Sequence, residues 1–444
     1  MQDVPYFFRD AWVQANATAL RAVAAAHEEP LPAEEIELRY ALLLLLPRML
    51  LRPTAARGDA GRREFERRAA LFSSNDWAPL IRCATPEPRA PQVRAHREPT
   101  MEERGVLCDR HVQRGEASLG CARLIGAPVA PGDEETLGLL RQGRAAEAAP
   151  LPEELLAAGA PVELDRGLYL QNIRRAARGK AADATGRRAE HLKVLLSDES
   201  CAGDLAEVAA LLASGRAVPE RARACFALGN MTALLRESVP RRKVRGTVAG
   251  DVLRRGVART LAQQFRPRLE TACAPYQFGL GTRAGTDAVA LFITSVLDLD
   301  EDRVILQLDA KGAFDNMSRE AMLQKLREVA PELLPFVLQF YGQASRYLWR
   351  DAAGVAHTIH QGSGGEQGDS LMPGLYSLGQ HDALEAASAR LHPDDLLLAF
   401  FDDLFVVTTR DRARAAYDVL AAEVPPRTGV QFEPSKTRAF GRRV

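Results

Sequence analysis

The chain has 444 residues, with 58 Lys and Arg against 58 Asp and Glu, and 46% of its residues are hydrophobic. This length allows two or three domains, and the composition is typical of a globular protein rather than a disordered one. The formal net charge is zero, so the protein as a whole has no charge excess that would attract a polyanion, and any nucleic-acid surface must be local.

The N-terminal sequence lacks a basic region followed by an apolar stretch, so we expect no secretion signal. The apolar run at residues 41–47 is too short to cross a bilayer, and we expect no membrane partner. The six cysteines have no paired spacing and are expected to be reduced thiols. A zinc site that includes Cys108, His111 and Cys121 matches no common zinc spacing and is the weaker interpretation.

Residues 1–150 are expected to form a mostly helical N-terminal region, whose role the sequence does not indicate. Helices are predicted at residues 11–27 and 33–51, and a shorter one at 134–148. Between them, residues 84–104 are polar and rich in proline, which is typical of an exposed linker.

From residue 165 the pattern changes, and residues 165–444 are expected to form a second region. Helices are predicted at 168–178, 187–196 and 205–212, and a β-hairpin at 232–235 and 243–249. Asp251 is a suitable N-cap for a helix that follows it, at residues 252–264.

Two segments of this region are locally basic. Residues 236–270 contain ten Lys and Arg against three Asp and Glu, and residues 171–193 contain seven against two. Such segments suit a nucleotide- and template-handling surface. They equally suit solvated helix faces, and the sequence leaves both interpretations open.

The C-terminal half alternates helices and strands. Residues 276–286 form a glycine-rich loop before a helix at 287–299, and residues 304–309 form a strand that ends on an acid. Helices at 318–329 and 333–345, a hairpin at 347–359 and a glycine-rich segment at 361–373 follow, and a helix then runs to 391. This order predicts an α+β fold, with helices packed on one face of an antiparallel sheet.

Acids interrupt two of the apolar strands. Asp402 and Asp403 lie within the apolar run at 397–407, which predicts two buried strands joined by a tight turn. Asp309 ends the strand at 304–309. Burying carboxylates is costly unless a cation meets them, and three strand-end acids can hold two Mg²⁺ ions for phosphoryl transfer. Each acid taken singly is better explained as part of an ordinary turn or strand end, and only their combination with the motifs below favours a metal site.

Four motifs in this region resemble the palm motifs of reverse transcriptases, most closely those of non-LTR retrotransposons. They are residues 308–315 (LDAKGAFD), 364–373 (GGEQGDSLMP), 400–403 (FFDD) and 429–437 (GVQFEPSKT). Residues 186–196 and 234–248 are similar to the fingers motifs, and residues 277–281 to the loop before the palm. The similarity covers roughly residues 165–440.

The resemblance implies roles for particular residues. Asp309 and Asp402 would bridge two Mg²⁺ ions, for which Mn²⁺ could substitute, and Asp403 would support them. The backbone carbonyl of Ala310 would help to bind the second ion. Lys436 would donate a proton to the leaving pyrophosphate. The remaining implied residues bind the incoming nucleotide or the template base pair: Phe314, which would exclude a 2′-hydroxyl, Gln367 and Gly368 in the base-pair pocket, and Lys243 and Arg245 on the triphosphate.

Some positions depart from the family pattern. Met372 stands where a serine is usual, Glu433 where an asparagine is usual, and residues 246–247 are Gly-Thr in place of Pro-Ile. None of these changes removes an expected metal ligand. The chain ends eight residues after Lys436, so we expect the thumb to be missing.

The resemblance therefore implies the fingers and palm of a retroelement RNA-directed DNA polymerase. Its expected partners are a primer on an RNA or DNA template and deoxynucleoside triphosphates, in the nucleus or the cytoplasm. Two alternatives remain: an RNA-templated RNA polymerase, and an inactive remnant or nucleic-acid-binding scaffold.

Overall fold

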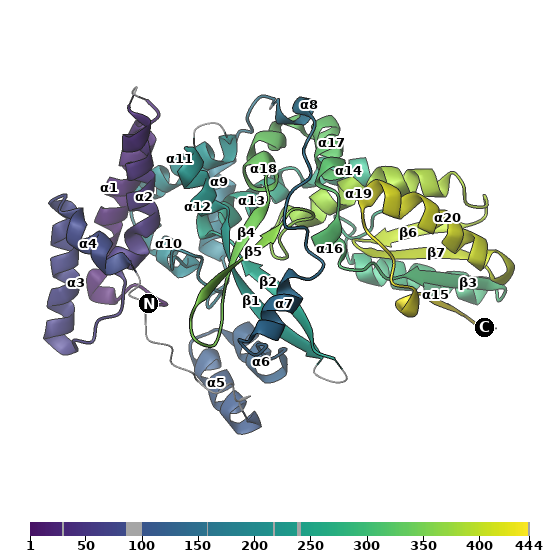
Figure 1. Ribbon diagram of the computed structural model, residues 1–444, viewed down its shortest axis with the longest axis horizontal. Coiled ribbons are helices and arrows are strands. Elements are labelled where there is room, and N and C mark those ends of the chain that lie inside the picture. Colours follow the sequence, from purple (N-terminus) through teal and green to yellow (C-terminus); the bar gives the residue numbers. More distant parts are fainter. Residues whose placement is uncertain (29–30, 86–99, 158, 216–217, 238–240, 443–444) are drawn as a thin grey trace. The chain divides into compact units, whose positions relative to one another are not determined.

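The computed structural model describes residues 1–444 except 29–30, 86–99, 158, 216–217, 238–240 and 443–444. The expected linker at 84–104 lies mostly outside the described residues. The described chain forms two compact units, each built from several segments (Figure 1). Unit 1 comprises Met1–Gln142, Glu163–Thr260 and Ser345–His360, and unit 2 comprises Gly143–Val162, Leu261–Ala344 and Gln361–Val444.

Unit 1 is mainly helical and contains one four-stranded sheet. The sheet has the order β2-β1-β4-β5, in which β1 pairs antiparallel with β2 and parallel with β4. Its elements are η1 (Tyr6–Phe8), α1 (Arg9–Ala25), α2 (Ala33–Leu50), α3 (Gly58–Ser73), α4 (Trp77–Ala84), α5 (Met101–Gln113), α6 (Ala117–Ile125), α7 (Glu134–Arg141), α9 (Arg166–Arg175), α10 (Ala189–Leu195), α11 (Glu199–Ser214), α12 (Glu220–Phe226), β1 (Leu228–Glu237), β2 (Lys243–Ala249), most of α13 (Val252–Gln264), β4 (Ser345–Arg350) and β5 (Ala356–Gln361).

Several expectations for unit 1 are confirmed. The hairpin predicted at 232–235 and 243–249 is formed by β1 and β2, and the side chain of Asp251 caps α13 by accepting a hydrogen bond from the backbone N–H of Arg254 at 2.9 Å. Two arginines of the basic segments fit neither interpretation of those segments, the template-handling surface or the solvated helix face. Arg187 and Arg254 are buried, so they belong to the core of this unit and are neither solvated nor available to a nucleic acid.

Unit 2 contains the second sheet, which carries the three acids. Its strand order is β6-β7-β3-β8, and all three strand pairs are antiparallel, as the sequence predicts. The elements are α8 (Glu153–Leu156), α14 (Arg266–Cys273), α15 (Gly285–Leu299), β3 (Arg303–Leu308), α16 (Ala313–Asn316), α17 (Arg319–Val329), η2 (Pro331–Leu333), α18 (Leu334–Tyr341), α19 (Met372–Ser388), β6 (Leu396–Phe400), β7 (Asp403–Thr409), α20 (Arg410–Thr428), η3 (Pro434–Lys436) and β8 (Arg438–Gly441). The mixed α+β character of the fold is confirmed.

Helices cover both faces of this sheet, so the prediction of helices on one face is wrong. On one face, Leu306 and Val406 pack in a cluster with Leu384 of α19 and Leu420 of α20. On the other face, Ile305, Leu398 and Val407 pack against α15. The physical reason is that the strands are apolar at successive positions, so both of their faces must be buried.

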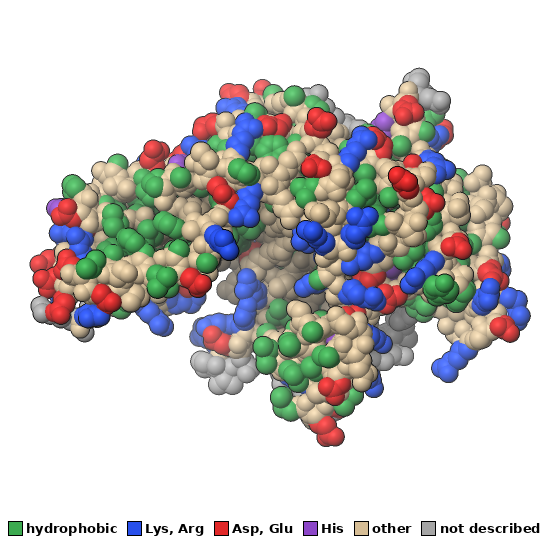
Figure 2. All heavy atoms as spheres, turned by 180° about the vertical axis from the view of Figure 1, so that it is seen from behind, with side chains coloured by type: hydrophobic (Ala, Val, Ile, Leu, Met, Phe, Trp, Pro, Cys, Tyr) green, Lys and Arg blue, Asp and Glu red, His purple; other side chains and the backbone are tan. Residues whose placement is uncertain are grey.

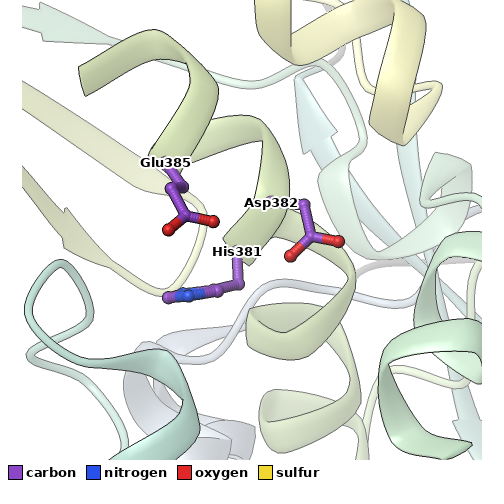
Figure 3. Close-up of side chains that lie close together, drawn as sticks. All are labelled: His381, Asp382 and Glu385. Atoms are coloured by element: carbon purple, nitrogen blue, oxygen red, sulfur yellow. The ribbon is translucent and has the colours of Figure 1, made fainter. Parts of the chain in front are cut away.

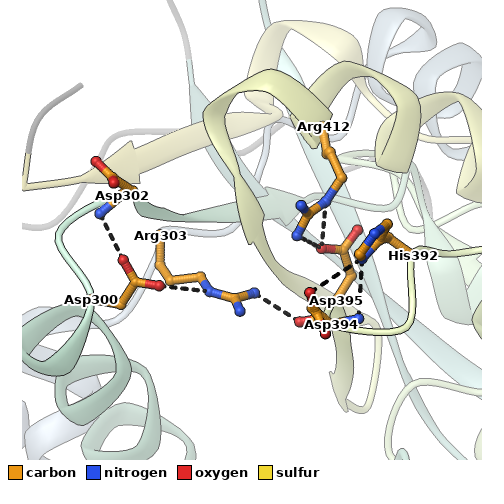
Figure 4. A network of polar contacts seen from close by, with 7 residues as sticks. All are labelled: Asp300, Asp302, Arg303, His392, Asp394, Asp395 and Arg412. Atoms are coloured by element: carbon orange, nitrogen blue, oxygen red, sulfur yellow. Dashed lines mark hydrogen bonds and ion pairs between the residues drawn. The ribbon is translucent and has the colours of Figure 1, made fainter.

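A polar network joins the first residues of β3 and β6, at the end of the sheet away from the acids (Figure 4). Arg303 forms an ion pair with Asp300 at 3.2 Å and donates to the carbonyl oxygen of Asp394 at 2.7 Å. Arg412 of α20 forms an ion pair with Asp395 at 2.8 Å. These contacts hold the first residues of β3 and β6 together. They thereby help to fix the positions of the opposite ends of β3 and β6, where the acids lie.

No helix of the described residues is long and apolar enough to cross a membrane. The face seen in Figure 2 carries both Lys or Arg and Asp or Glu side chains.

Candidate active site

The turn between β6 and β7 carries two of the predicted acids. Phe400 pairs with Asp403, which leaves Phe401 and Asp402 as a two-residue turn. Phe401 has a φ of 53°, in the left-handed region that a large side chain rarely adopts. Such a conformation costs about 1–3 kcal/mol, and residues held in this way cluster at functional sites.

The register of the sheet brings Asp309 to the same place. Leu308, the last residue of β3, lies opposite Leu404 of β7. Asp309 follows Leu308 and Asp403 precedes Leu404, so the antiparallel register places the two acids side by side. Directly opposed residues in such a pair have Cβ atoms roughly 5 Å apart. We call Asp309, Asp402 and Asp403 the strand-end acids.

The electrostatics of Asp403 show that the three charges act on one another. The pKa of this carboxyl group is raised, first because it is partly buried and then because of the negative charges of Asp402 and Asp309. Like charges held together disfavour the ionised state, and a divalent cation relieves this repulsion. Carboxylate oxygens are also the ligands that Mg²⁺ prefers, so the residues fit the predicted ion.

The fourth motif runs alongside the end of β3. Ala310 forms an isolated antiparallel bridge with Phe432, next to β8. The two hydrogen bonds of this bridge are made by its neighbours: Lys311 N–H donates to the carbonyl of Gln431 at 2.7 Å, and Glu433 N–H donates to the carbonyl of Asp309 at 2.9 Å. The carbonyl of Ala310 takes part in neither bond, as its predicted role requires.

Lys436 reaches the strand-end acids from the same segment. Its Nζ lies 3.0 Å from Oδ1 of Asp309, in an ion pair that is mostly exposed to solvent. The structure therefore brings together four of the residues that the sequence predicts as catalytic, from segments about a hundred residues apart in the chain.

One aromatic ring, that of Tyr376, lies between Phe314 and these acids. The side chain of Phe314 packs on Tyr376 of α19, with ring centroids 4.8 Å apart and an interplanar angle of 31°. The pKa of the Tyr376 hydroxyl is raised mainly by burial, and also by the charges of Asp402 and Asp403. Tyr376 is thus the link between the predicted sugar-contacting residue and the acids, and the sequence analysis did not identify it.

The second glycine-rich segment is tied to the backbone around Phe314. Gly365 N–H donates to the carbonyl of Phe314 at 2.8 Å, and Gly364 N–H donates to the carbonyl of Met317 at 2.7 Å. Gln367 is half-buried, and Gly368 is exposed with a φ of 118°, which only glycine adopts readily. The two predicted pocket residues therefore lie on a loop that is anchored beside Phe314.

Two buried or half-buried arginines support this region, and neither was predicted. Arg319 is 5% exposed and donates to the carbonyl oxygens of Gly364 and Gln361, both at 2.9 Å. Arg144 forms an ion pair with Asp315 of the first motif at 3.2 Å. No signal in the sequence identifies them, because an arginine that binds distant carbonyls looks like any surface arginine.

Lys243 and Arg245, predicted to bind the triphosphate, lie on β2 in unit 1. Both are exposed, and Lys243 forms an ion pair with Glu237 at 2.7 Å. Because these residues belong to the other compact unit, their role toward the strand-end acids remains a prediction.

A second group of potential metal ligands lies on α19 (Figure 3). His381, Asp382 and Glu385 have ligand atoms within 4.8 Å of one another, and they form the only such group of three in the described part of the chain. We call them the helix cluster. Lys325 already forms an ion pair with Asp382 at 2.7 Å, so a cation occupies this side of the cluster. The strand-end acids do not form such a group in the described part of the chain.

No family model and no curated protein matches the sequence. Among solved structures, the chain is similar to apo telomerase from Candida tropicalis, with a TM-score of 0.38 and 12% identity over 49% of this chain and 44% of that one. It is also similar to telomerase from Candida tropicalis in complex with a TWJ fragment of telomeric RNA, with a TM-score of 0.37 and 12% identity over 48% of this chain and 41% of that one. The matched region spans less than half of the telomerase chains, and similarity at this level does not assign the chain to a family.

Proposed function

We propose that this chain is an RNA-directed DNA polymerase of the retroelement type, which transfers deoxynucleotides onto the 3′-hydroxyl of a primer. The observation that carries the proposal is the meeting of the strand-end acids. An antiparallel sheet brings Asp309 beside Asp403, and Asp402 occupies a strained turn next to them. The four motifs that resemble those of reverse transcriptases indicate which reaction we expect.

In this proposal the strand-end acids and the carbonyl of Ala310 hold two Mg²⁺ ions. When bound, the ions would polarise the reacting phosphate and stabilise the charges of the attacking and leaving oxygens. The protein contributes the fixed positions of the carboxylates, because they extend from strands whose opposite ends are held by the Arg303 and Arg412 ion pairs.

The other residues act on the substrates. Lys436, whose Nζ lies beside Asp309, would hold the proton that the leaving pyrophosphate takes up. Phe314, supported by Tyr376, would exclude a 2′-hydroxyl and so favour deoxynucleotides over ribonucleotides. Gln367 and Gly368 would contact the base pair, and Lys243 and Arg245 the triphosphate.

In this proposal Phe314 and the Gln367-Gly368 motif favour a DNA polymerase over an RNA-templated RNA polymerase. A small residue in its place would leave room for a 2′-hydroxyl, so Phe314→Ala should admit ribonucleotides. We therefore expect the wild-type chain to incorporate dTTP and reject UTP, and the variant to incorporate both.

The test is primer extension by the purified chain on a poly(rA)/oligo(dT) duplex with Mg²⁺, beside the variant Asp402→Asn. Incorporation of dTTP that the variant abolishes supports the proposal. If the folded wild-type chain incorporates nothing, the chain is not an autonomous polymerase. Binding of the duplex without extension would then favour the nucleic-acid-binding scaffold.

A further inference from the structure

The segment just before α15 contacts the turn that carries Asp402. Gln277 of this segment forms a parallel bridge with Ala399 of β6. Phe278 N–H donates to the carbonyl of Ala399, and Ala399 N–H donates to the carbonyl of Tyr276, both at 2.8 Å. The backbone of Gln277 is therefore fixed to the strand that leads into the turn.

The side chain of Gln277 holds the strained residue of that turn. Its Oε1 accepts a hydrogen bond from the backbone N–H of Phe401 at 2.7 Å, and its Nε2 donates to the carbonyl of Phe401 at 3.4 Å. The same Oε1 accepts from Gly279 N–H at 3.1 Å, which fixes the orientation of the amide. One side chain thus binds both polar backbone groups of the residue whose φ is 53°.

The ring of Phe401 is held from the same segment. A Cβ atom placed on Gly279 would lie 2.9 Å from three atoms of this ring, so the glycine allows the ring to pack directly on the backbone. Gln277 and Gly279 together restrain the backbone and the side chain of Phe401. Asp402 is the next residue, and its position depends on the backbone of Phe401.

We propose that Gln277 is a positioning residue that holds Phe401 in its left-handed conformation and thereby places the carboxylate of Asp402 for metal binding. The consequence for metal binding rests on the proposed function, because it takes Asp402 as a ligand. The contact itself does not. Groups that orient metal ligands in this way typically change metal affinity by about 10–100-fold when they are removed.

The first measurement tests the contact without any metal. Hydrogen exchange of the Phe401 amide is compared in metal-free wild type and in Gln277→Leu, with Gln324→Leu as the matched control. Gln324 is an exposed residue of α17 whose side chain donates to Glu320 of the same helix. Faster exchange at Phe401 in Gln277→Leu alone is expected. Equal exchange in the three proteins would overturn the inference.

The second measurement tests the consequence by Mn²⁺ binding, followed by electron paramagnetic resonance of the free ion. Gln277→Leu should weaken Mn²⁺ binding by about tenfold, whereas Gln324→Leu should not change it. Adding Phe401→Gly to Gln277→Leu should restore most of the affinity, because glycine adopts a positive φ without support. A loss that Phe401→Gly does not restore would show that Gln277 only stabilises the fold, and would overturn the inference.

These measurements separate the two proposals. If wild type binds Mn²⁺ through Asp402 but extends no primer, the proposed polymerase function fails while the role of Gln277 is still tested in full. If Asp402→Asn binds Mn²⁺ as wild type does, the proposed metal site and the role of Gln277 in metal binding both fail.

Discussion

The strand-end acids and the helix cluster lie in the same compact unit, but their charges are balanced differently. Lys325 forms ion pairs with both Asp382 and Glu328, and it lowers the pKa of His381 after the larger effect of burial. At the strand ends, Lys436 forms an ion pair with Asp309, but three acids face this one lysine, and the pKa of Asp403 is raised by burial and by the charges of Asp402 and Asp309. Proximity of ligand atoms favours the helix cluster as a metal site, whereas the excess of acids over the one ion-paired lysine, Lys436, favours the strand ends. The proposed metal site therefore rests on charge balance and not on the proximity of ligand atoms.

The largest effect is expected from removing a strand-end charge. Asp309→Asn should lower the rate of primer extension by at least about 100-fold, because a lost metal ligand removes several kcal/mol of transition-state stabilisation. The matched control Asp382→Asn, in the helix cluster, should leave the rate within about twofold of wild type. Steady-state extension assays check both. Equal losses in the two variants would contradict the distinction between the clusters.

The two lysines offer a second test. Lys436→Gln should slow extension by about 100-fold, the lower range for a lost general acid, with little change in the Mg²⁺ concentration required. Lys325→Gln makes the same chemical change beside the helix cluster and should leave the rate unchanged. Rates measured at saturating nucleotide check this prediction, and a slow Lys325→Gln enzyme would count against it.

Removing charge should affect stability in opposite directions at the two clusters. Asp403→Asn relieves repulsion among the strand-end acids, so without metal it should raise the midpoint of thermal unfolding by about 2 °C. Asp382→Asn removes an ion pair with Lys325 and should lower the midpoint slightly. Thermal scans in chelator check both signs. A lower midpoint for Asp403→Asn would show that the acids do not repel one another.

The smallest effect concerns the ion pairs of Lys325. Lys325→Gln should cost about 0.5 kcal/mol of the free energy of unfolding, because its carboxylate partners are exposed. Denaturant unfolding measures this change. The Lys325→Gln variant should also give the helix cluster weak affinity for Mn²⁺. If the cluster of this variant still binds no ion, Lys325 is not what excludes the ion.

The sequence predicts where the three acids lie, because a carboxylate within an apolar run marks the end of a strand or a turn. Asp309, Asp402 and Asp403 each stand at the end of such a run, and the structure brings them together. The hairpins and the cap at Asp251 follow from equally local patterns. The order of the strands in the sheet also agrees with an antiparallel α+β fold.

The supporting contacts could not be predicted. Gln277 and Phe401 lie 124 residues apart in the chain, and Arg144 and Asp315 lie 171 apart. Such bonds depend on the register of strands and on side-chain direction, which spacing in the sequence does not determine. The helix α15 was predicted, but its place on the second face of the sheet was missed, since a short apolar strand does not reveal which helix will cover it. The predicted division at residues 150–165 and the roles of Lys243 and Arg245 stay predictions.

The most direct test of the account is the position of bound metal. Crystals of the chain soaked in Mn²⁺ should give anomalous scattering peaks between Asp309 and the Asp402–Asp403 pair, and these peaks should be absent in Asp309→Asn. Peaks at His381, Asp382 and Glu385, with none at the strand ends, would contradict the central claim that the strand-end acids form the metal site.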